Sequence, residues 1–242
     1  MSISPGVLRK LAQYDTPTIC NVIELFDIRP RNTGYMDGRI RAAFPAFPPM
    51  VGFAVTTAFR SDAPAGGTDV YGSFTQQLER FHELPGPPVL VFQDLDDPPV
   101  AATFGEVMCS TYQAFGSVGL ITSGGGRDLL QVQALKFPVF TGGTICSHAY
   151  CHLLHVGQSV RVGGLVVRQA DLLHGDANGV TNIPLEIAAD VADASEEFIA
   201  AEAHVIGYNR SSGPKSIAEL AERQKLMQAD LQKIRSKVQK KR

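Results

Sequence analysis

The residues best suited to chemistry lie in one stretch, residues 103–128, which reads TFGEVMCSTYQAFGSVGLITSGGGRD. Three consecutive glycines, residues 124–126, stand directly before Arg127 and Asp128. Glycines are most useful where the backbone must turn with positive φ or approach a ligand closely. A planar guanidinium beside a carboxylate suits an acidic small molecule together with a hard divalent cation. From these residues alone, a surface ion pair on a glycine loop is an equally good interpretation.

Two short elements must position this pair. Gly105 and Glu106 begin a segment with helical spacing, in which the backbone amides of Val107 and Met108 would form an anion-binding helix start. Residues 118–122 then form the apolar, β-branched run of a buried parallel-type strand, which ends in the glycines. Glu106 alone could equally be an acid that the dipole of the helix favours.

The order of these features resembles the family of the regulator of ribonuclease activity A, the RraA-like proteins. The resemblance rests on Gly-Glu at 105–106, Gly-Gly-x-Arg-Asp at 124–128, Phe-Pro-Val-Phe at 137–140 and Gly-Asp-Ala-Asn-Gly-Val at 175–180. It covers roughly residues 8–190. This family includes divalent-metal 4-hydroxy-4-methyl-2-oxoglutarate/4-carboxy-4-hydroxy-2-oxoadipate aldolases and was long mislabelled as menaquinone methyltransferases. The chain departs from the family at Ser123 and Asn21, where aspartate is common.

The resemblance implies a role for each residue of the site. Asp128 would bind Mg²⁺ or Mn²⁺ directly, and Glu106 would hold the metal through water. The amides of Val107 and Met108, next to Gly105, would hold the carboxylate of pyruvate. Arg127 stays charged at neutral pH, so it can stabilise an oxyanion but cannot act as a base. The sequence identifies no side chain as the base.

These roles describe a class II pyruvate aldolase that cleaves a 4-hydroxy-2-oxo acid and that could also decarboxylate oxaloacetate. Both reactions pass through the same pyruvate enolate. The rival hypothesis is a non-catalytic protein that regulates a ribonuclease by binding it. Arg127, Asp128 and Glu106 favour the enzyme, whereas a long basic tail favours the interaction protein.

Composition restricts the class of protein. The 242 residues are 44% hydrophobic, enough for one large core, and they contain neither a signal-peptide pattern nor an apolar run that could span a membrane. Four scattered cysteines favour a reducing, cytoplasmic location. The net charge is −2, and residues 233–242 hold six basic residues and no acid. The rest of the chain is therefore strongly acidic, and an acidic protein surface is a poor general binder of nucleic acid.

The remaining patterns predict an α/β fold. We expect helices at 5–13, 17–27, 70–82 and 184–208, strands at 51–59 and 89–92, and β-hairpins between 156 and 183. The resemblance implies a compact α-β-β-α sandwich of the swivelling β/β/α type. We divide the chain into an RraA-like domain, residues 1–212, and a C-terminal helical extension, residues 213–242.

The extension carries apolar or long side chains at intervals of three and four residues: Ile217, Leu220, Gln224, Met227, Leu231, Ile234 and Val238. Such a stripe must be buried, so we expect it to pack on a neighbouring subunit or to form a coiled coil. The resemblance implies a homotrimer or a hexamer of paired trimers, in which a glutamate of the adjacent subunit reaches the metal through water. The candidates are Glu196, Glu197 and Glu202.

Two other clusters have residue types that bind metals. Asp94, Asp96 and Asp97 follow a predicted strand, but the prolines after them favour a solvated acidic turn. Cysteine and histidine also gather between residues 146 and 155, with a spacing that fits no zinc finger. We therefore expect neither cluster to be the metal site.

Overall fold

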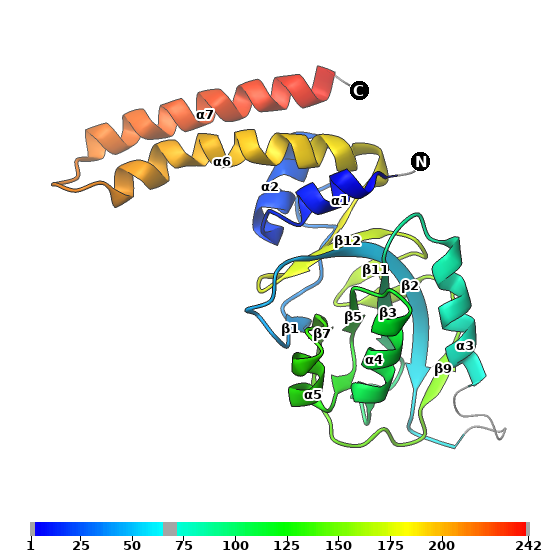
Figure 1. Ribbon diagram of the computed structural model, residues 1–242. Coiled ribbons are helices and arrows are strands. Elements are labelled where there is room, and N and C mark those ends of the chain that lie inside the picture. The colour runs from blue at the N-terminus through cyan, green and yellow to red at the C-terminus, as the bar shows by residue number, and fades with distance from the viewer. Residues whose placement is uncertain (1–2, 65–71, 241–242) are drawn as a thin grey trace.

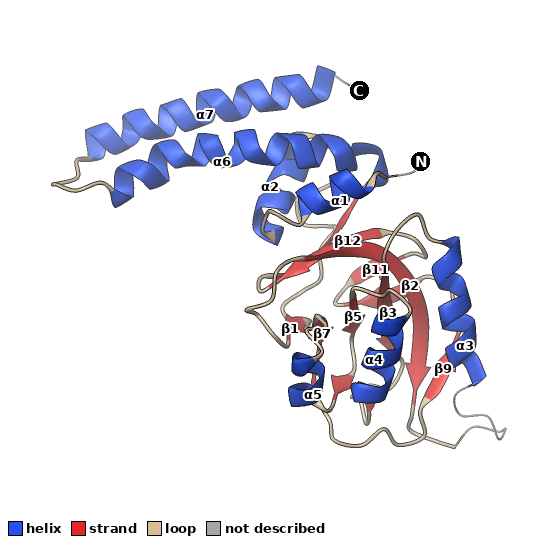
Figure 2. Cartoon of the chain, in the orientation of Figure 1, coloured by secondary structure: helices blue, strands red, loops and turns tan. Residues whose placement is uncertain are grey.

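The computed structural model describes residues 3–64 and 72–240 and has a mixed α/β architecture (Figures 1 and 2). Its large sheet has the strand order β1-β7-β5-β3-β2-β12-β13, and β9 pairs with the far half of β2. The bounds of these strands are β1 Arg41–Ala42, β2 Met50–Arg60, β3 Pro88–Asp94, β5 Gly119–Thr122, β7 Val139–Thr141, β9 His152–Leu154, β12 Leu172–Asp176 and β13 Gly179–Ile183.

The centre of the sheet is parallel because helices connect its strands. β2, β3, β5 and β7 run parallel to one another, whereas β1, β9, β12 and β13 pair antiparallel at the margins. Ten of the eleven residues of β2 are buried, as expected for a strand covered on both faces. The connecting helices are α3 Gly72–Glu79 with the 3₁₀ turn η1 Arg80–Glu83, α4 Glu106–Ala114 and α5 Leu129–Ala134. The first two residues of the helix that we predicted at 70–82 lie outside the described residues.

Each face of the sheet has its own apolar cluster. One face packs against α3, α4 and α5, with Tyr112 fully buried among Phe81, Phe92 and Leu120. The opposite face is covered by the hairpin of β10 Val160–Val162 and β11 Leu165–Val167. Two layers therefore enclose the parallel strands, one on each face, and the α/β class predicted from the sequence is confirmed.

A second group of helices covers one end of the sheet (Figure 1). It consists of α1 Pro5–Leu11, α2 Thr16–Leu25, α6 Ala188–Arg210 after the turn η2 Leu185–Ile187, and α7 Ile217–Lys240. Ser4 and Asp15 accept hydrogen bonds from the first turns of α1 and α2, and each helix has proline at its start. The C-terminal helical part predicted from the sequence is present.

A buried histidine ties this layer to the sheet. His174 of β12 lies with Nδ1 3.0 Å from Thr16 Oγ1 and Nε2 3.2 Å from the carbonyl oxygen of Leu11. Because a carbonyl only accepts, Nε2 must carry the proton and Nδ1 accepts from the threonine hydroxyl. Burial lowers the pKa of His174, so the neutral ring is the folded form.

Part of the apolar stripe of α7 packs against helices of the same chain. α7 runs back antiparallel along α6, with Ile234 and Val238 buried in the apolar cluster of α1, α2 and α6. A hydrogen bond between His204 Nε2 and Asp230 Oδ2, 2.9 Å apart, links the two helices. Toward the turn between the helices the burial ends, since Ile217 is 88% exposed. The domain boundary at residue 212 and the role of the extension in oligomerisation stay predictions.

Candidate active site

Three very short parallel strands place the predicted site residues together. β4 Ala102–Phe104, β6 Gly125–Gly126 and β8 Gly143–Thr144 form a small separate sheet. Because carboxyl ends of parallel strands meet at one edge, Gly105 after β4 and Arg127 after β6 become neighbours. The amide of Arg127 donates to the carbonyl oxygen of Phe104 at 3.1 Å, which fixes this register.

Asp128 is held in a special conformation. Its φ of 55° and ψ of 37° are left-handed, which is uncommon for a residue other than glycine. It stands at the start of α5 but its side chain does not cap that helix. Instead, Asp128 Oδ2 accepts from the backbone amide of Glu106 at 3.0 Å, at the start of α4. The carboxylate thus keeps its other oxygen available at the place where β4 turns into α4.

Gly105 makes this approach possible. A Cβ atom at position 105 would lie 2.6 Å from Asp128 Oδ2 and 3.1 Å from Arg127 Nε. The guanidinium of Arg127 stands beside the carboxylate, with Nε 3.9 Å from Asp128 Oδ2, and both side chains are partly exposed. The structure therefore brings Gly105, Arg127 and Asp128 into direct proximity, as the sequence predicted.

The start of α4 offers unused donors. No described group accepts a hydrogen bond from the amides of Val107 or Met108, whereas Cys109 N already donates to Gly105 O at 3.0 Å. Glu106 is exposed at the same helix start, and Val107 is 77% exposed. An anion with one carboxylate could therefore reach the two amides beside Asp128.

The donor set is compatible with a hard divalent cation held mainly by water and substrate. In the described part of the chain, no three residues among histidine, cysteine, aspartate and glutamate are grouped as a closed metal cage. Mg²⁺ usually keeps several waters and takes one or two carboxylates. Asp128 with a free oxygen and the exposed Glu106 nearby supply that number.

Two buried thiols lie behind the pair. Burial raises the pKa of Cys109 far above its usual value, and the charge of Asp128 raises it further. Burial raises the pKa of Cys151 to about 11, opposed by the charge of Arg127. Both thiols are therefore protonated at neutral pH and act as apolar packing. Cys146 and His148, of the same cysteine and histidine stretch, are exposed.

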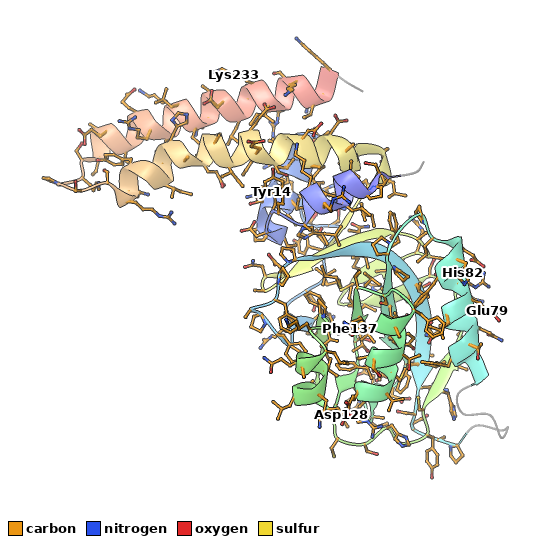
Figure 3. All side chains as sticks on the ribbon, viewed as in Figure 1. Tyr14, Glu79, His82, Asp128, Phe137 and Lys233 are labelled. Carbon is orange, nitrogen blue, oxygen red and sulfur yellow. The ribbon has the colours of Figure 1, made fainter. Side chains whose placement is uncertain are left out.

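The three candidate glutamates lie far from the site of their own chain. Glu196, Glu197 and Glu202 belong to α6, and Figure 3 shows Asp128 at the opposite end of the molecule from the α6–α7 pair. Glu197 is paired with Lys237 of α7. A glutamate of α6 could reach Asp128 only from another subunit, so this contribution stays a prediction.

The sequence analysis missed a cavity at one edge of the large sheet. It has a volume of about 830 Å³ and is lined by Asp94, Ser123, Gly124 and Arg161, but by neither Arg127 nor Asp128. We call it the sheet-end cavity, because Asp94 and Ser123 stand at the carboxyl ends of β3 and β5. That position of Asp94 on a parallel strand was the signal in the sequence.

The prediction of a solvated acidic turn at residues 94–97 is wrong in part. Asp96 is buried and accepts from Ser61 N at 2.7 Å and Ser61 Oγ at 3.1 Å. Desolvation raises the pKa of the Asp94 carboxyl to about 6. Only Asp97 is exposed, because the chain folds the first two carboxylates inward against β2 and the glycine loop.

Two curated proteins are similar to part of this chain. A protein of Halalkalibacterium halodurans named "Putative 4-hydroxy-4-methyl-2-oxoglutarate aldolase" is 33% identical to this chain over 84 residues. These residues are 34% of this chain and 40% of that protein. An uncharacterised protein of Methanocaldococcus jannaschii is 28% identical over 99 residues, or 40% of this chain and 47% of that protein. The matched segments therefore span less than half of each of these relatives.

Solved structures share the fold over most of the chain. An uncharacterised protein from Pseudomonas syringae pv. tomato superimposes with a TM-score of 0.71 at 20% identity, covering 93% of this chain and 95% of that one. Streptomyces coelicolor RraAS2, described as an unusual member of the RNase ES inhibitor RraA protein family, gives 0.67 at 19% identity, covering 88% and 99%. A structure titled as novel cellulases from gut-associated microbes gives 0.70 at 26% identity, covering 84% and 88%.

The family assignment rests on the match to a family model. The model described as "RraA-like: Aldolase/RraA" matches residues 16–181, which include every residue of the site around Asp128. The same region contains the Gly-Glu and Gly-Gly-x-Arg-Asp patterns. This chain belongs to the RraA-like family.

Proposed function

We propose that this protein is a divalent-metal-dependent carbon–carbon lyase, a class II pyruvate aldolase. Its substrate would be 4-hydroxy-4-methyl-2-oxoglutarate or a similar 4-hydroxy-2-oxo acid, and oxaloacetate would be decarboxylated as a side reaction. The observation that carries the proposal is the contact of Asp128 Oδ2 with the Glu106 amide, 3.0 Å, beside the guanidinium of Arg127. This arrangement leaves the second oxygen of Asp128, the guanidinium of Arg127 and the free amides of Val107 and Met108 available around one exposed site.

Substrate binding begins at the start of α4. The amides of Val107 and Met108 would receive the carboxylate of the 2-oxo acid, where the dipole of α4 favours negative charge. Because Asp128 already satisfies the Glu106 amide, the next two amides are the donors that remain for substrate. This orients the 2-oxo group toward Asp128 and Arg127.

Cleavage between C3 and C4 leaves a pyruvate enolate, whose new negative charge lies on the former keto oxygen. Arg127 is positioned to stabilise that charge, and it does so most strongly in the transition state. Losing one such donor typically costs about 100- to 1000-fold in rate. The planar guanidinium also holds the substrate in register through more than one N–H group.

The residues around Asp128 fit Mg²⁺ or Mn²⁺, which would act there as a Lewis acid on the 2-oxo group. Asp128 would be the direct ligand, and Glu106 would hold an ordered water. Glu106 is exposed, so it can exchange a proton between that water and solvent. Since no other described carboxylate joins the two, the Glu106 water is the simplest route for the proton.

The test is pyruvate release from oxaloacetate and from 4-hydroxy-4-methyl-2-oxoglutarate, with and without Mg²⁺ or Mn²⁺. We expect metal-dependent release with both substrates, and its loss in Asp128→Ala. Asp193→Ala is the matched control, because Asp193 is an exposed carboxylate of α6 that pairs with Lys10. If the wild-type protein with excess metal releases no pyruvate from either compound, the lyase proposal fails.

The second candidate is a non-catalytic protein that binds and regulates a ribonuclease. The exposed apolar side chains of the α6–α7 pair favour it: Ile199 and Ile206 on α6 and Leu226 on α7. Six of the last ten residues of the chain are also basic. Under this candidate, the wild-type protein would bind a ribonuclease and α7 truncation would abolish binding, while Asp128→Ala would leave it unchanged.

A further inference from the structure

The sheet-end cavity has the position and size of a ligand site that the lyase chemistry does not use. Asp94 ends β3, Ser123 follows β5, and Gly142 follows β7, so the floor is the carboxyl edge of three adjacent parallel strands. Open α/β sheets bind ligands at this edge. Its volume of about 830 Å³ lies within the range of small-molecule sites.

Asp94 on the floor is held at an energetic cost. Its Oδ1 accepts from Asp96 N at 3.0 Å, whereas its buried Oδ2 has no hydrogen-bond partner among the described residues. A Cβ at Gly124 would lie 2.5 Å from Oδ2, so glycine is needed for the carboxyl to sit there. An unsatisfied buried acceptor destabilises the folded protein. A carboxyl kept in a cleft despite this cost, with a pKa raised to about 6, is characteristic of a functional site.

The charged groups of the cavity divide into engaged and available ones. Arg39 is bound bidentately by Asp37, at 2.9 and 2.6 Å, and Asp96 is occupied by Ser61. Arg161 and Asp97 are exposed and form no ion pair with a described residue. A ligand would therefore meet one free guanidinium and the carboxyls of Asp94 and Asp97.

Neutral polar groups fill the space between these charges. The amide oxygen of Gln93 accepts from Arg161 N at 2.8 Å, which leaves its NH₂ group to donate. Ser123 Oγ accepts from Asp94 N at 2.9 Å and can still donate its own proton. Glycines 142, 143, 163 and 164 expose backbone on the walls. Because a hydroxyl group both donates and accepts hydrogen bonds, these polar groups of the cavity are suited to bind the hydroxyl groups of a ligand.

Ser123 also lowers the negative charge of the floor. The RraA-like resemblance puts aspartate at this position, which would place a second carboxylate beside Asp94. With serine there, the cavity of this chain is better suited to an acidic ligand. Ser123 faces this cavity, whereas Arg127 and Asp128 do not line it, so the replacement acts on the cavity and not on the lyase residues.

We propose that the sheet-end cavity binds a small polyhydroxylated carboxylic acid, of the sugar-acid class. Arg161 holds the carboxylate, and Asp94 and Asp97 accept from hydroxyl groups, with Gln93 and Ser123 between them. The site is separate from the lyase site and does not depend on lyase activity.

Isothermal titration calorimetry with D-gluconate tests this directly, with D-sorbitol and hexanoate as ligands that lack the carboxylate or the hydroxyls. We expect gluconate to bind at least tenfold more tightly than either. Arg161→Gln should weaken gluconate binding about tenfold or more, since it removes a charge-assisted hydrogen bond to the carboxylate. Ser123→Asp should weaken it by repulsion. Arg168→Gln, an exposed arginine on the same hairpin but outside the cavity, is the matched control.

The outcomes separate this site from the lyase site. Gluconate binding that survives Arg127→Ala supports a second site, and binding that Arg127→Ala abolishes overturns it. Equal affinity of wild type and Arg161→Gln would also overturn it, as would an absence of gluconate binding. None of these results depends on pyruvate release, so failure of the lyase proposal is recognised separately.

Discussion

Gly105 shows how a single residue can decide whether a site exists. Its missing side chain lets Asp128 reach the amide of Glu106 at 3.0 Å. We predict that Gly105→Ala abolishes pyruvate release and leaves the fold intact, because the new Cβ, 2.6 Å from Asp128 Oδ2, displaces a partly exposed side chain rather than the core. Gly38→Ala is the control, since a Cβ there meets nothing within 4 Å. Full activity of Gly105→Ala with an unchanged melting curve would contradict this role.

Asp128 and Arg127 should have separable effects. Asp128→Ala should remove metal dependence and activity together, because the ion loses its direct protein ligand. Arg127→Ala should keep metal binding but lower kcat about 100-fold or more, and Arg127→Lys should recover little because lysine lacks the planar fork. Kinetics combined with Mn²⁺ binding followed by electron paramagnetic resonance distinguish the two. Loss of Mn²⁺ binding in both variants would contradict the division of roles.

Asp94 should make stability depend on pH. Its folded pKa of about 6 lies above the usual 3.8, because burial disfavours the charged form. The folded state therefore holds a proton more tightly than the unfolded state, and the protein loses stability as pH rises from about 4 through 6. We predict that Asp94→Asn melts at a higher temperature than wild type at pH 7.5 and that the difference shrinks toward pH 4. A constant difference across this range would argue against a buried, titrating Asp94.

At the scale of elements, α7 stabilises the helical layer through its last turns. Ile234 and Val238 are buried against α1, α2 and α6, and Gln239 Nε2 donates to Leu25 O at 3.2 Å. We predict that Ile234→Ala lowers the free energy of unfolding by about 2–5 kcal/mol, as buried isoleucines do. Leu226→Ala, at a half-exposed position of the same helix, should change it little. Urea denaturation measures both, and equal effects would mean that α7 is not anchored at this end.

Truncation after Gly213 tests the proposed role of the extension in assembly. It removes α7 and exposes the apolar face of α6, so stability should fall whatever the oligomeric state. We also expect a lower oligomer mass by light scattering. An unchanged mass together with reduced stability would restrict α7 to support within its own chain.

Elements with a clear period could be predicted from the sequence, and the small parallel sheet could not. The long apolar run of β2 and the stripes of α2 and α6 indicate burial by themselves. β6 and β8 are two residues each, and their register of Gly125 against Gly143 depends on the packing of distant segments. The sequence therefore identified Arg127 and Asp128, but not the left-handed Asp128 or its contact with α4.

The partner of α7 illustrates a second limit. A stripe of apolar residues predicts that a helix is buried, and it does not tell which surface buries it. Here the last turns of α7 pack against α6 of the same chain, whereas Ile217, the first residue of α7, is exposed. The sheet-end cavity is a related case: the position of Asp94 at the end of a strand can be read from the sequence, whereas its proximity to Arg161 is produced only by the fold.

At the scale of the whole molecule, the proposed lyase site lies at an open surface. Exposed apolar side chains flank it at the starts of α4 and α5: Val107 is 77% exposed and Leu130 79%. Such a patch beside a site marks an interaction surface, and catalysis of an enolate benefits from excluding water. A second subunit docked here would cover the patch, and it could supply the glutamate that α6 of the same chain cannot.

Two glutamate substitutions distinguish whether subunits assemble through this surface or through the α6–α7 pair. Leu130→Glu places a charge in the patch, so it should dissociate the oligomer and lower pyruvate release together. Ile217→Glu introduces the same charge at an equally exposed position of α7, 88% exposed, and should leave activity unchanged. Light scattering and the pyruvate assay on the same samples give both readouts. Dissociation by Ile217→Glu alone would move the interface to α7, and an unchanged mass in both variants would contradict a subunit contact at either place. Dissociation by Leu130→Glu without loss of activity would mean that one subunit holds the complete site.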